Sequence, residues 1–421
     1  MTFYREHDFQ ITDIGKIPKE WSIARLSEIG DVSTGKTPAT ANSSYWDGDI
    51  PFITPADMNE KYVFRTERKI TLEATTQTKV LPKNAVMVVC IGSTIGKVAL
   101  TSRESSTNQQ INSIITDSVS PEFLYYSILS RASLLKAMSG IAAVPIVKKS
   151  LFEQLKVALP SKLEQSEIAR VLGAVDSALE LVNRVIAKTE RLKKALMKQL
   201  ITHGIGHTEY KRSTELVSQV PENWDVVRFK DANERIFVGI ATSSTKHFAS
   251  QGVPLLRNQN IKETGVDLSD LVFINRDFAD ANKSKALKEN DIVIVRTGFP
   301  GLSSRVTKEM VGWQTFTTLI SRPKLSEFDS DFLVYVLNSP ICKHQIARLQ
   351  AGLAQQNLNV GSIVNLYVPK PPKTEQIRIA ERIKAIYEKQ RLEKESFEKL
   401  KRIKQGLMNI LLTGKVRIEV D

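Results

Sequence analysis

Two short polar segments of the sequence carry side chains of the types that pair with the edges of nucleic-acid bases. Arg257-Asn258-Gln259-Asn260 follows directly on the apolar run 253–256. Arginine can present two donors to guanine, and asparagine or glutamine can offer adenine one donor and one acceptor. The corresponding place 203 positions earlier shares almost no residues with it, and its candidates are Thr54, Asp57 and Asn59. A polar segment after a strand can equally be a solvated turn, so both interpretations stay open.

A second pair of segments offers groups that can hold phosphates. Each follows an apolar run that predicts a strand, 86–91 in the first half of the chain and 291–295 in the second. Lysine and arginine contribute charge, and hydroxyls contribute hydrogen bonds. The candidates are Ser93, Thr94, Lys97, Arg296, Thr297, Ser303, Ser304 and Arg305.

Aromatic and amide clusters are weaker candidates. Tyr45 and Trp46 could stack on bases, although such residues more often pack in a core. The clusters 108–110 and 355–357 contain amides of the right chemistry for base contacts, but amides near a domain edge often satisfy backbone groups instead.

Patterns typical of catalysis are missing from the sequence. The segment 92–97 resembles a phosphate loop, but its glycines are one residue too close, and Val98 stands where Ser or Thr would hold magnesium. His203 and His207 have the spacing of two metal ligands on a helix, yet the glycines between them argue against a helix. We therefore expect this chain to contain no catalytic residue, no metal and no cofactor.

The candidate segments belong to a sequence that repeats itself. The run 17–21, Ile-Pro-Lys-Glu-Trp, returns as Val-Pro-Glu-Asn-Trp at 220–224, an offset of 203 positions. The run 160–165 returns at 371–376, an offset of 211. A slowly rising offset is what a tandem duplication with loop insertions leaves behind. Two diverged copies predict a pseudo-symmetric molecule that performs one task twice.

Each copy predicts a mixed α/β domain followed by a long helix. Short apolar runs bounded by turn residues predict strands at 49–53 and 291–295, and helical periodicity is found near 122–130 and 331–337. The expected division of the chain is 1–154 for the first domain, 155–203 for the first spacer helix, 204–365 for the second domain and 366–421 for the second spacer helix.

The predicted long helices keep apolar residues at a period of seven. The segment 163–201 lacks proline, begins with a capping box formed by Ser161 and Glu164, and is followed by Gly204, as Gly414 follows the second helix. At about 1.5 Å per residue it would be roughly 58 Å long. The heptads predict an antiparallel coiled coil, although a helix buried in an ordinary core can show the same stripe. The expected helix-pairing residues are Ile168, Leu172, Val175, Leu179, Ile186, Leu196, Ile379, Ile383, Ile386, Phe397, Leu400 and Leu407.

The overall composition favours a polyanionic partner. The 421 residues include 59 Lys and Arg against 46 Asp and Glu, which gives a net charge of +13. A moderate positive charge can also serve solubility alone. Cys90 and Cys342 form no CxxC pair, and neither a long apolar run nor the apolar core of a signal peptide is present. We expect a cytoplasmic protein.

Three blocks of the sequence closely resemble a known family. They are the motif 12–21, Thr-Asp-Ile-Gly-Lys-Ile-Pro-Lys-Glu-Trp, the turn 92–97, and the helix openings Pro-x-x-x-Glu-Gln-x-x-Ile-Ala at Pro160 and Pro371. Their order and their doubling resemble the specificity subunit of type I restriction-modification systems over essentially the whole chain. The resemblance implies an α+β fold, with two pseudo-symmetric mixed α/β target-recognition domains separated by two long antiparallel helices that form a coiled coil.

The resemblance also implies a division of labour with other subunits. Each domain would read one half of a bipartite, gapped sequence of double-stranded DNA, while the helices would set the spacer and dock two modification (methyltransferase) subunits. S-adenosylmethionine, ATP and magnesium would be needed only in those and in the restriction and translocase subunits. This chain would be a recognition subunit without catalysis or membrane contact.

Two other classes of function remain open at this point. A non-catalytic coiled-coil scaffold with two protein-binding domains would explain the duplication and the heptads, but not the excess positive charge. A fused enzyme with an unrecognised site is the third alternative.

Overall fold

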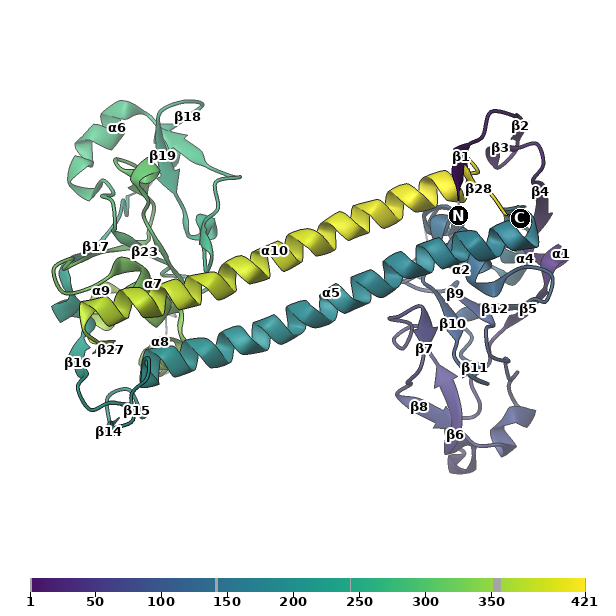
Figure 1. The fold of residues 1–421 in the computed structure, drawn as a ribbon, viewed down its shortest axis with the longest axis horizontal. Coiled ribbons are helices and arrows are strands. Elements are labelled where there is room, and N and C mark those ends of the chain that lie inside the picture. The colour runs from purple at the N-terminus through teal and green to yellow at the C-terminus, as the bar shows by residue number, and fades with distance from the viewer. Residues whose placement is uncertain (1, 141–142, 243, 351–356, 421) are drawn as a thin grey trace. The chain divides into compact units, whose positions relative to one another are not determined.

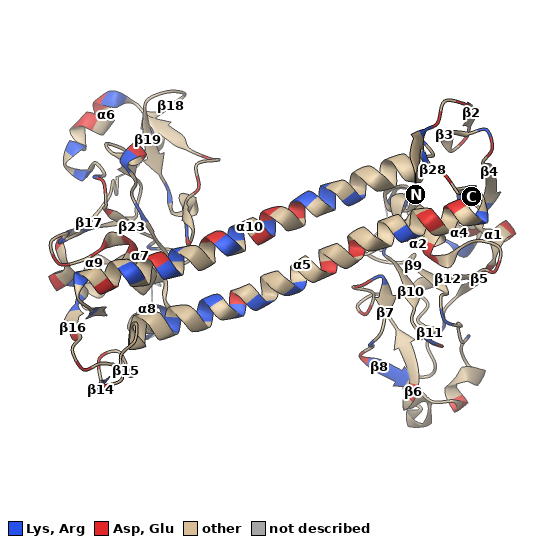
Figure 2. Ribbon diagram, viewed as in Figure 1, with Lys and Arg blue, Asp and Glu red and all other residues tan. Residues whose placement is uncertain are grey.

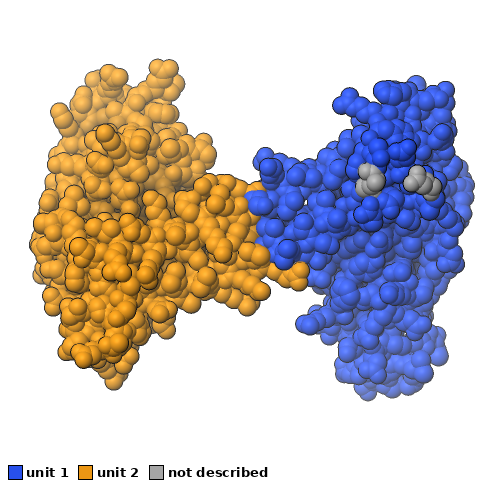
Figure 3. Space-filling model, in the orientation of Figure 1, with its two compact units in different colours: residues 1–183, 396–421 blue, residues 184–395 orange. Residues whose placement is uncertain are grey.

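The computed structural model describes residues 2–140, 143–242, 244–350 and 357–420 (Figure 1). The chain divides into two compact units, shown in Figure 3. Unit 1 comprises Met1–Asn183 with Ser396–Asp421, and unit 2 comprises Arg184–Glu395. The division falls within the two long helices, α5 (Lys162–His203) and α10 (Lys373–Leu411), so each unit contains part of both. The domain boundaries expected from the sequence, at 154, 203 and 365, stay a prediction.

Unit 1 contains two sheets. Their strands are β5 (Asp31–Thr34), β6 (Trp46–Ile53), β7 (Tyr62–Val63), β8 (Arg68–Ile70), β9 (Val86–Val89), β10 (Val98–Thr101), β11 (Ser106–Thr107) and β12 (Ile111–Ile115). The larger sheet has the order β5-β12-β9-β10-β7, and the smaller has the order β11-β6-β8. Every residue of β9 is buried, as expected for a β-branched run in the middle of a sheet. Strand β6 pairs parallel with β11 and antiparallel with β8.

Unit 2 repeats this arrangement. Its main strands are β17 (Asn233–Val238), β18 (Phe248–Ala249), β19 (Val253–Leu256), β22 (Val272–Ile274), β23 (Ile292–Ile294), β24 (Ser303–Arg305), β25 (Gln314–Thr315) and β26 (Leu319–Pro323). The orders are β17-β26-β23-β24 and β18-β22-β19-β25. As in unit 1, the strand before the first candidate segment pairs with one parallel and one antiparallel neighbour. The predicted duplication is confirmed in the topology.

One helix packs near the large sheet of each unit, and both helices begin where the sequence predicts. Helix α2 (Pro121–Ser130) has Ser120 as its N-cap, and α7 (Ser330–Asn338) has Asp329, whose side chain accepts from the Phe332 amide at 2.8 Å. A further antiparallel strand pair leads into each long helix. These pairs are β4 (Ser22–Arg25) with β13 (Lys156–Leu159) and β16 (Asp225–Arg228) with β27 (Tyr367–Lys370).

The remaining α-helices and strands lie outside these main elements. They are β1 (Phe3–Arg5), β2 (Phe9–Thr12), β3 (Gly15–Pro18), α1 (Leu26–Ile29), α3 (Ala132–Met138), α4 (Lys149–Glu153), β14 (Tyr210–Ser213), β15 (Ser218–Pro221), β20 (Ile261–Lys262), β21 (Gly265–Val266), α6 (Arg276–Ala281), α8 (Pro340–Gln350), α9 (Val360–Ile363) and β28 (Val416–Ile418).

Within each unit the two long helices run antiparallel. In unit 1, Lys404 pairs with Asp176 at 2.6 Å, and Met408 lies in the same core as the earlier residue Ile168. In unit 2, Thr189 donates to Glu393 at 3.0 Å, and the Tyr387 hydroxyl approaches the Met197 sulfur at 3.5 Å. The partner's number falls as the number along α5 rises, which confirms the antiparallel direction.

All twelve residues expected to pair the helices are buried or half-buried. The buried ones are Ile168, Leu172, Ile379, Ile383 and Ile386, and the half-buried ones are Val175, Leu179, Ile186, Leu196, Phe397, Leu400 and Leu407. Several of them join the domain cores, since Ile168 and Leu172 pack with unit 1 and Ile379 and Ile383 with unit 2. The helix stripes are therefore partly built into the domain cores, and the pairing role of their other residues stays a prediction.

The Glu-Gln motif at the start of each long helix binds the helix to its domain. The Gln165 side chain accepts from the Ser120 amide and donates to the Pro160 carbonyl, both at 2.9 Å. Gln376 makes the equivalent bonds to Asp329 and Pro371, also at 2.9 Å. Each glutamine thus joins the first turn of a long helix to the N-terminus of α2 or α7.

The predicted capping box is only half right. The Ser161 hydroxyl does accept from the Glu164 amide at 3.2 Å. The Glu164 carboxylate, however, accepts from Trp21 Nε1 at 3.2 Å and from the Arg417 guanidinium at 3.0 and 3.1 Å. The predicted helix-ending glycine Gly414 does have a left-handed backbone, with φ of 68°.

Candidate nucleic-acid interface

The first candidate segments of the two units share one local framework. In unit 2, where β19 ends, the Arg257 amide donates to the Asn260 side chain at 3.0 Å. In unit 1, where β6 ends, the Thr54 amide donates to Asp57 at 2.8 Å. Each bond joins two residues that are three positions apart in the chain, and the equivalent residues of the two loops are 203 positions apart. Asn260 and Asp57 therefore hold the loop shape, and the other residues of each loop are free to differ.

In each unit the two predicted segments meet. The Asn258 amide group donates to the Thr297 hydroxyl at 2.8 Å in unit 2. In unit 1, Lys97 Nζ donates to the Pro55 carbonyl at 3.0 Å and to Asn59 Oδ1 at 3.2 Å. Hydrogen bonds between the loops fix the spacing of their side chains, which base recognition requires. The exposed hydroxyls of Ser93 and Thr94 belong to the same turn as Lys97 and complete the unit 1 cluster.

A carboxylate that sequence reasoning missed adjoins the unit 2 cluster. Asp270 Oδ2 accepts from Arg257 Nη2 at 2.9 Å and from Gln259 Nε2 at 2.6 Å. The Arg257 side chain is 26% exposed and that of Asp270 is 68% exposed, so the pair lies at the surface. Asp270 is thirteen residues from Arg257 in the chain and follows the β20-β21 hairpin. No periodicity or motif links the two positions.

Several candidates of the second unit 2 segment turn inward. Ser303 and Ser304 are 0% and 1% exposed, and the Ser304 hydroxyl bonds to the Lys262 and Gly265 carbonyls at 2.6 and 3.0 Å. Arg305 Nε donates to Asp331 at 2.7 Å, and Arg296 Nε donates to the Leu358 carbonyl at 3.1 Å. The two serines satisfy backbone groups inside the domain, so we leave them out of the proposed interface.

The aromatic pair also packs inward. Trp46 is 8% exposed, lies edge-on to Phe52 with ring centroids 5.3 Å apart, and is covered by the Arg68 guanidinium at 3.5 Å. Of the amide clusters, Asn108 is buried and bonds to Gln110 at 2.9 Å, while Gln355 and Gln356 lie outside the described residues. The buried Trp46 and Asn108 therefore do not belong to the exposed loops above.

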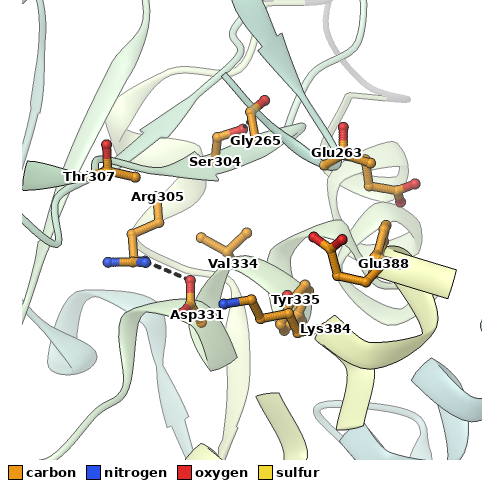
Figure 4. A pocket seen from close by; sticks show the side chains of 12 residues that line it. Glu263, Gly265, Ser304, Arg305, Thr307, Asp331, Val334, Tyr335, Lys384 and Glu388 are labelled. Atoms are coloured by element: carbon orange, nitrogen blue, oxygen red, sulfur yellow. Dashed lines mark hydrogen bonds and ion pairs between the residues drawn. The ribbon is translucent and has the colours of Figure 1, made fainter. Parts of the chain in front are cut away.

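Unit 2 has a polar pocket where its domain meets α10. Figure 4 shows the pocket, about 180 Å³ in volume, between the β20-β21 hairpin, β24, α7 and α10. Arg305 and Asp331 pair on one side, the amine of Lys384 of α10 lies toward Asp331, and Glu388 of α10 lies on the opposite side. Nearby, Lys193 of α5 pairs with Glu263 of the hairpin at 3.2 Å. An ion pair thus connects this domain to α5, and the charged side chains of Lys384 and Glu388 on α10 line the pocket beside it.

Unit 1 has a different polar contact at the equivalent place. The Tyr126 hydroxyl of α2 donates to Asp176 of α5 at 2.7 Å, and Asp176 also pairs with Lys404 of α10. Burial, and then the Asp176 charge, raise the pKa of Tyr126, so its hydroxyl stays protonated and can donate. One carboxylate therefore holds the domain helix and both long helices together.

Comparison with known proteins identifies the domains. A family model for the type I restriction modification DNA specificity domain matches this chain twice, at residues 18–191 and 221–402. The two matches cover well over half of the chain and coincide with the two copies of the repeat. The chain belongs to the type I restriction-modification specificity subunits.

Relatives of this specificity subunit match it from end to end. The MjaVIII specificity subunit of Methanocaldococcus jannaschii is 26% identical over 100% of this chain and 98% of its own length. The MjaIX specificity subunit of the same organism is 28% identical, with coverage of 99% and 98%. Among solved structures, the S subunit from M. genitalium covers 95% of this chain and 97% of its own, with a TM-score of 0.59 and 15% identity. That likeness concerns the fold.

The long helices of the specificity subunit expose apolar residues at equivalent positions. Leu181 and Leu192 of α5 are 57% and 52% exposed, and Leu392 and Ile403 of α10, each 211 positions later, are 56% and 43% exposed. Unit 1 therefore exposes Leu181 with Ile403, and unit 2 exposes Leu192 with Leu392. Elsewhere both helices carry cationic and anionic residues (Figure 2).

Among the described residues, no helix combines the length and the apolar character that a membrane span requires.

Proposed function

We propose that each unit reads one half of a bipartite double-stranded DNA sequence through its two joined loops. The observation that carries the proposal is the shared framework with different side chains. Both loops close with the same backbone to side-chain bond, yet one unit presents Arg257, Asn258 and Gln259 and the other presents Asn59 and Lys97. A constant framework with variable donors and acceptors is what two domains need in order to read unlike half-sites.

The long helices have two roles in this proposal. They set the number of unread base pairs between the half-sites, and they dock two modification subunits. The apolar pairs Leu181 with Ile403 and Leu192 with Leu392 support the docking role, because exposed aliphatic side chains at equivalent places are typical of contact surfaces. Two such pairs, one in each unit, match two copies of the same partner.

Chemistry on the DNA belongs to the partners. The modification subunits bind S-adenosylmethionine, flip an adenine from each half-site and methylate it, since the reacting base must leave the stack. ATP and magnesium serve the restriction and translocase subunits. In this chain, burial raises the pKa of Cys90 and Cys342 to about 12, so neither thiol is a ready nucleophile. The complex acts in the cytoplasm.

Selection from a library of random duplex DNA tests the proposal. The full-length chain should enrich a motif of two specified parts separated by unspecified base pairs. Asn258→Ala should change only one part and Asn59→Ala only the other, because the two residues lie in different units. An ungapped motif, or a change in both parts from one substitution, would contradict two independent half-site contacts.

Salt dependence provides a second measurement. Binding that neutralises phosphates gives a linear fall of log K with log salt, with a slope of about 0.9 for each phosphate contacted. We expect a slope of several units for random duplex DNA. A flat dependence, with no enriched motif, would favour a protein-binding scaffold instead.

A further inference from the structure

Asp270 makes contacts with three of the four residues of the 257–260 segment. Its Oδ2 atom accepts from Arg257 Nη2 at 2.9 Å and from Gln259 Nε2 at 2.6 Å. Its carbonyl oxygen accepts from the same Arg257 nitrogen at 2.9 Å and from Asn260 Nδ2 at 3.1 Å. The two long polar side chains that point outward from this loop therefore depend on one acidic residue.

The turn that carries Asp270 is itself fixed. The Asp267 amide donates to the Asn260 carbonyl at 2.7 Å, and Asn260 Nδ2 donates back to the Asp267 carbonyl at 3.1 Å. The Asp267 carboxylate accepts from the amide and hydroxyl of Ser269 at 3.0 and 2.7 Å. Because the turn is fixed on both sides, Asp270 can restrict Arg257 and Gln259 before any DNA arrives, which lowers the entropy lost on binding.

The charge of Asp270 affects what Arg257 can bind. A free arginine at a DNA interface is attracted to any phosphate, whereas one paired with a carboxylate has its charge largely cancelled. The pairing occupies Nη2, and Nε is buried without a partner, so Nη1 is the guanidinium nitrogen left to donate to DNA. Arginine reads guanine through donors of this planar group. The geometry favours contact with a base edge over contact with a backbone phosphate.

The fold itself does not require this arrangement. In unit 1 the equivalent of Arg257 is Thr54, whose amide and hydroxyl both bond to Asp57 within the same loop, at 2.8 and 2.7 Å. The unit 1 loop therefore closes without a carboxylate from outside the loop that bonds to a long, outward-pointing side chain. Asp270 is thus a feature of unit 2 that accompanies Arg257 and Gln259.

We propose that Asp270 is a positioning residue that sets the base preference of the half-site read by unit 2, by orienting Arg257 and Gln259 and withholding Arg257 from phosphates. This inference rests on the proposed function, because it assumes that unit 2 contacts DNA through the 257–260 loop. It assigns Asp270 itself no base contact.

Asp270→Asn in the full-length chain tests the inference. The amide keeps the size of the side chain but removes its charge. Discrimination at one base position of one half-site should fall about tenfold. Affinity for random duplex DNA should rise, and its salt slope should steepen by about 0.9, because Arg257 can then neutralise a phosphate. Asp280→Asn, which changes the same charge at an exposed site on α6, should leave the base preference as in the parent chain.

Two further variants separate the outcomes. Arg257→Ala should relax the same base position, and adding D270N to it should change nothing more at that position, since there Asp270 acts through Arg257. Asp270→Glu keeps the charge, so it should keep the parent salt slope and restore discrimination in part, which also decides the matter if D270N folds poorly.

Each contrary result has a distinct meaning. If Arg257→Ala left the motif unchanged, the proposed DNA contact of this loop would fail, and the role of Asp270 with it. If Arg257→Ala relaxed the motif while D270N behaved as the parent chain or as D280N, only the role of Asp270 would be overturned. An additive effect of the two substitutions at that same base position would likewise overturn action through Arg257.

Discussion

At the scale of single residues, the two units hold the start of their long helices with the same tryptophan and glutamate pair but with a different third residue. Trp21 Nε1 donates to Glu164 at 3.2 Å, and Trp224 Nε1 donates to Glu375 at 3.1 Å. Arg417 completes the first cluster and His207, at 2.8 Å from Glu375, completes the second. A buried carboxylate needs such partners, because removing one leaves an uncompensated charge.

Arg417→Met should therefore destabilise unit 1. The Glu164 side chain is 1% exposed and that of Arg417 is 11% exposed, so the loss should be about 3 kcal/mol at pH 7. Urea denaturation followed by tryptophan fluorescence measures the change. Arg170→Met, which alters an exposed arginine on the same helix as Glu164, is the control and should cost under about 1 kcal/mol. Equal losses from both substitutions would show that the buried cluster contributes nothing special.

The cost of Arg417→Met should also depend on pH. The Asp8 amide, and then the Arg417 guanidinium, hold the pKa of Glu6 below its ordinary value of 4.5. A carboxyl group with a lowered folded pKa stabilises the protein above its unfolded pKa, and this contribution disappears as the pH falls through the folded value. The difference between parent and variant should therefore narrow below about pH 4.5. A difference that widens in acid would contradict the Glu6 contact.

At the scale of elements, the seven-residue pattern predicted the long helices but not the roles of their polar residues. Gln390, Lys193 and Lys404 interrupt the apolar stripes. In the structure Lys404 pairs with Asp176, Gln390 bonds to Glu190, and Lys193 pairs with Glu263. The first two contacts could be expected from antiparallel register. The third could not, because Glu263 belongs to a hairpin whose place is set by the folding of the whole domain.

The candidate loops were predictable to a similar extent. Strand ends and residue chemistry pointed to Arg257, Asn258 and Lys97, which the structure brings next to their partner segments. Ser304 looked equally suitable in sequence, but its hydroxyl satisfies two carbonyls of a neighbouring hairpin. Asp270 could not be found at all, since its nearness to Arg257 arises from tertiary packing. Local sequence thus identifies the loop, and long-range contacts decide which of its side chains face outward.

Lengthening both long helices should change the spacer that the protein tolerates. Four added residues, about one turn or 6 Å, placed between 179 and 185 in α5 and between 394 and 400 in α10, keep each polar contact within its own unit. The unread gap should grow by one or two base pairs at roughly 3.4 Å each. Selection on DNA with random spacers measures the gap. The same insertion in α5 alone is the control and should lower stability, and an unchanged gap in the double insertion would exclude a spacing role.

At the scale of the whole molecule, the duplication should make the half-sites separable. Replacing residues 223–365 with the same region of a relative that reads another sequence should alter one half of the motif and leave the other half and the gap unchanged. The framework bonds of unit 1 lie outside the exchanged region, which is the reason for this expectation. Genome-wide methylation mapping in a host with the hybrid would reveal the motif. Changes in both halves would show that the units do not act independently.

The long helices also make each core depend on distant parts of the sequence. Leu411 is buried in the core of unit 1, and Leu200, 211 positions earlier, is buried in the core of unit 2. Leu411→Ala should cost about 3 kcal/mol and speed hydrogen exchange in β9 but not in β23. Leu200→Ala is the matched control and should have the reverse effect. Loss of protection in the same strands from both substitutions would contradict separate cores.

This sharing of helix ends bears on the order in which the protein can mature during synthesis. Domains generally fold one after another as they leave the ribosome, the N-terminal one first. Here Met408 and Leu411, which complete the core of unit 1, are translated after every residue of unit 2. The core of unit 1 therefore cannot be completed until unit 2 has been synthesised. During that interval the incomplete core exposes apolar surface that chaperones and proteases can bind.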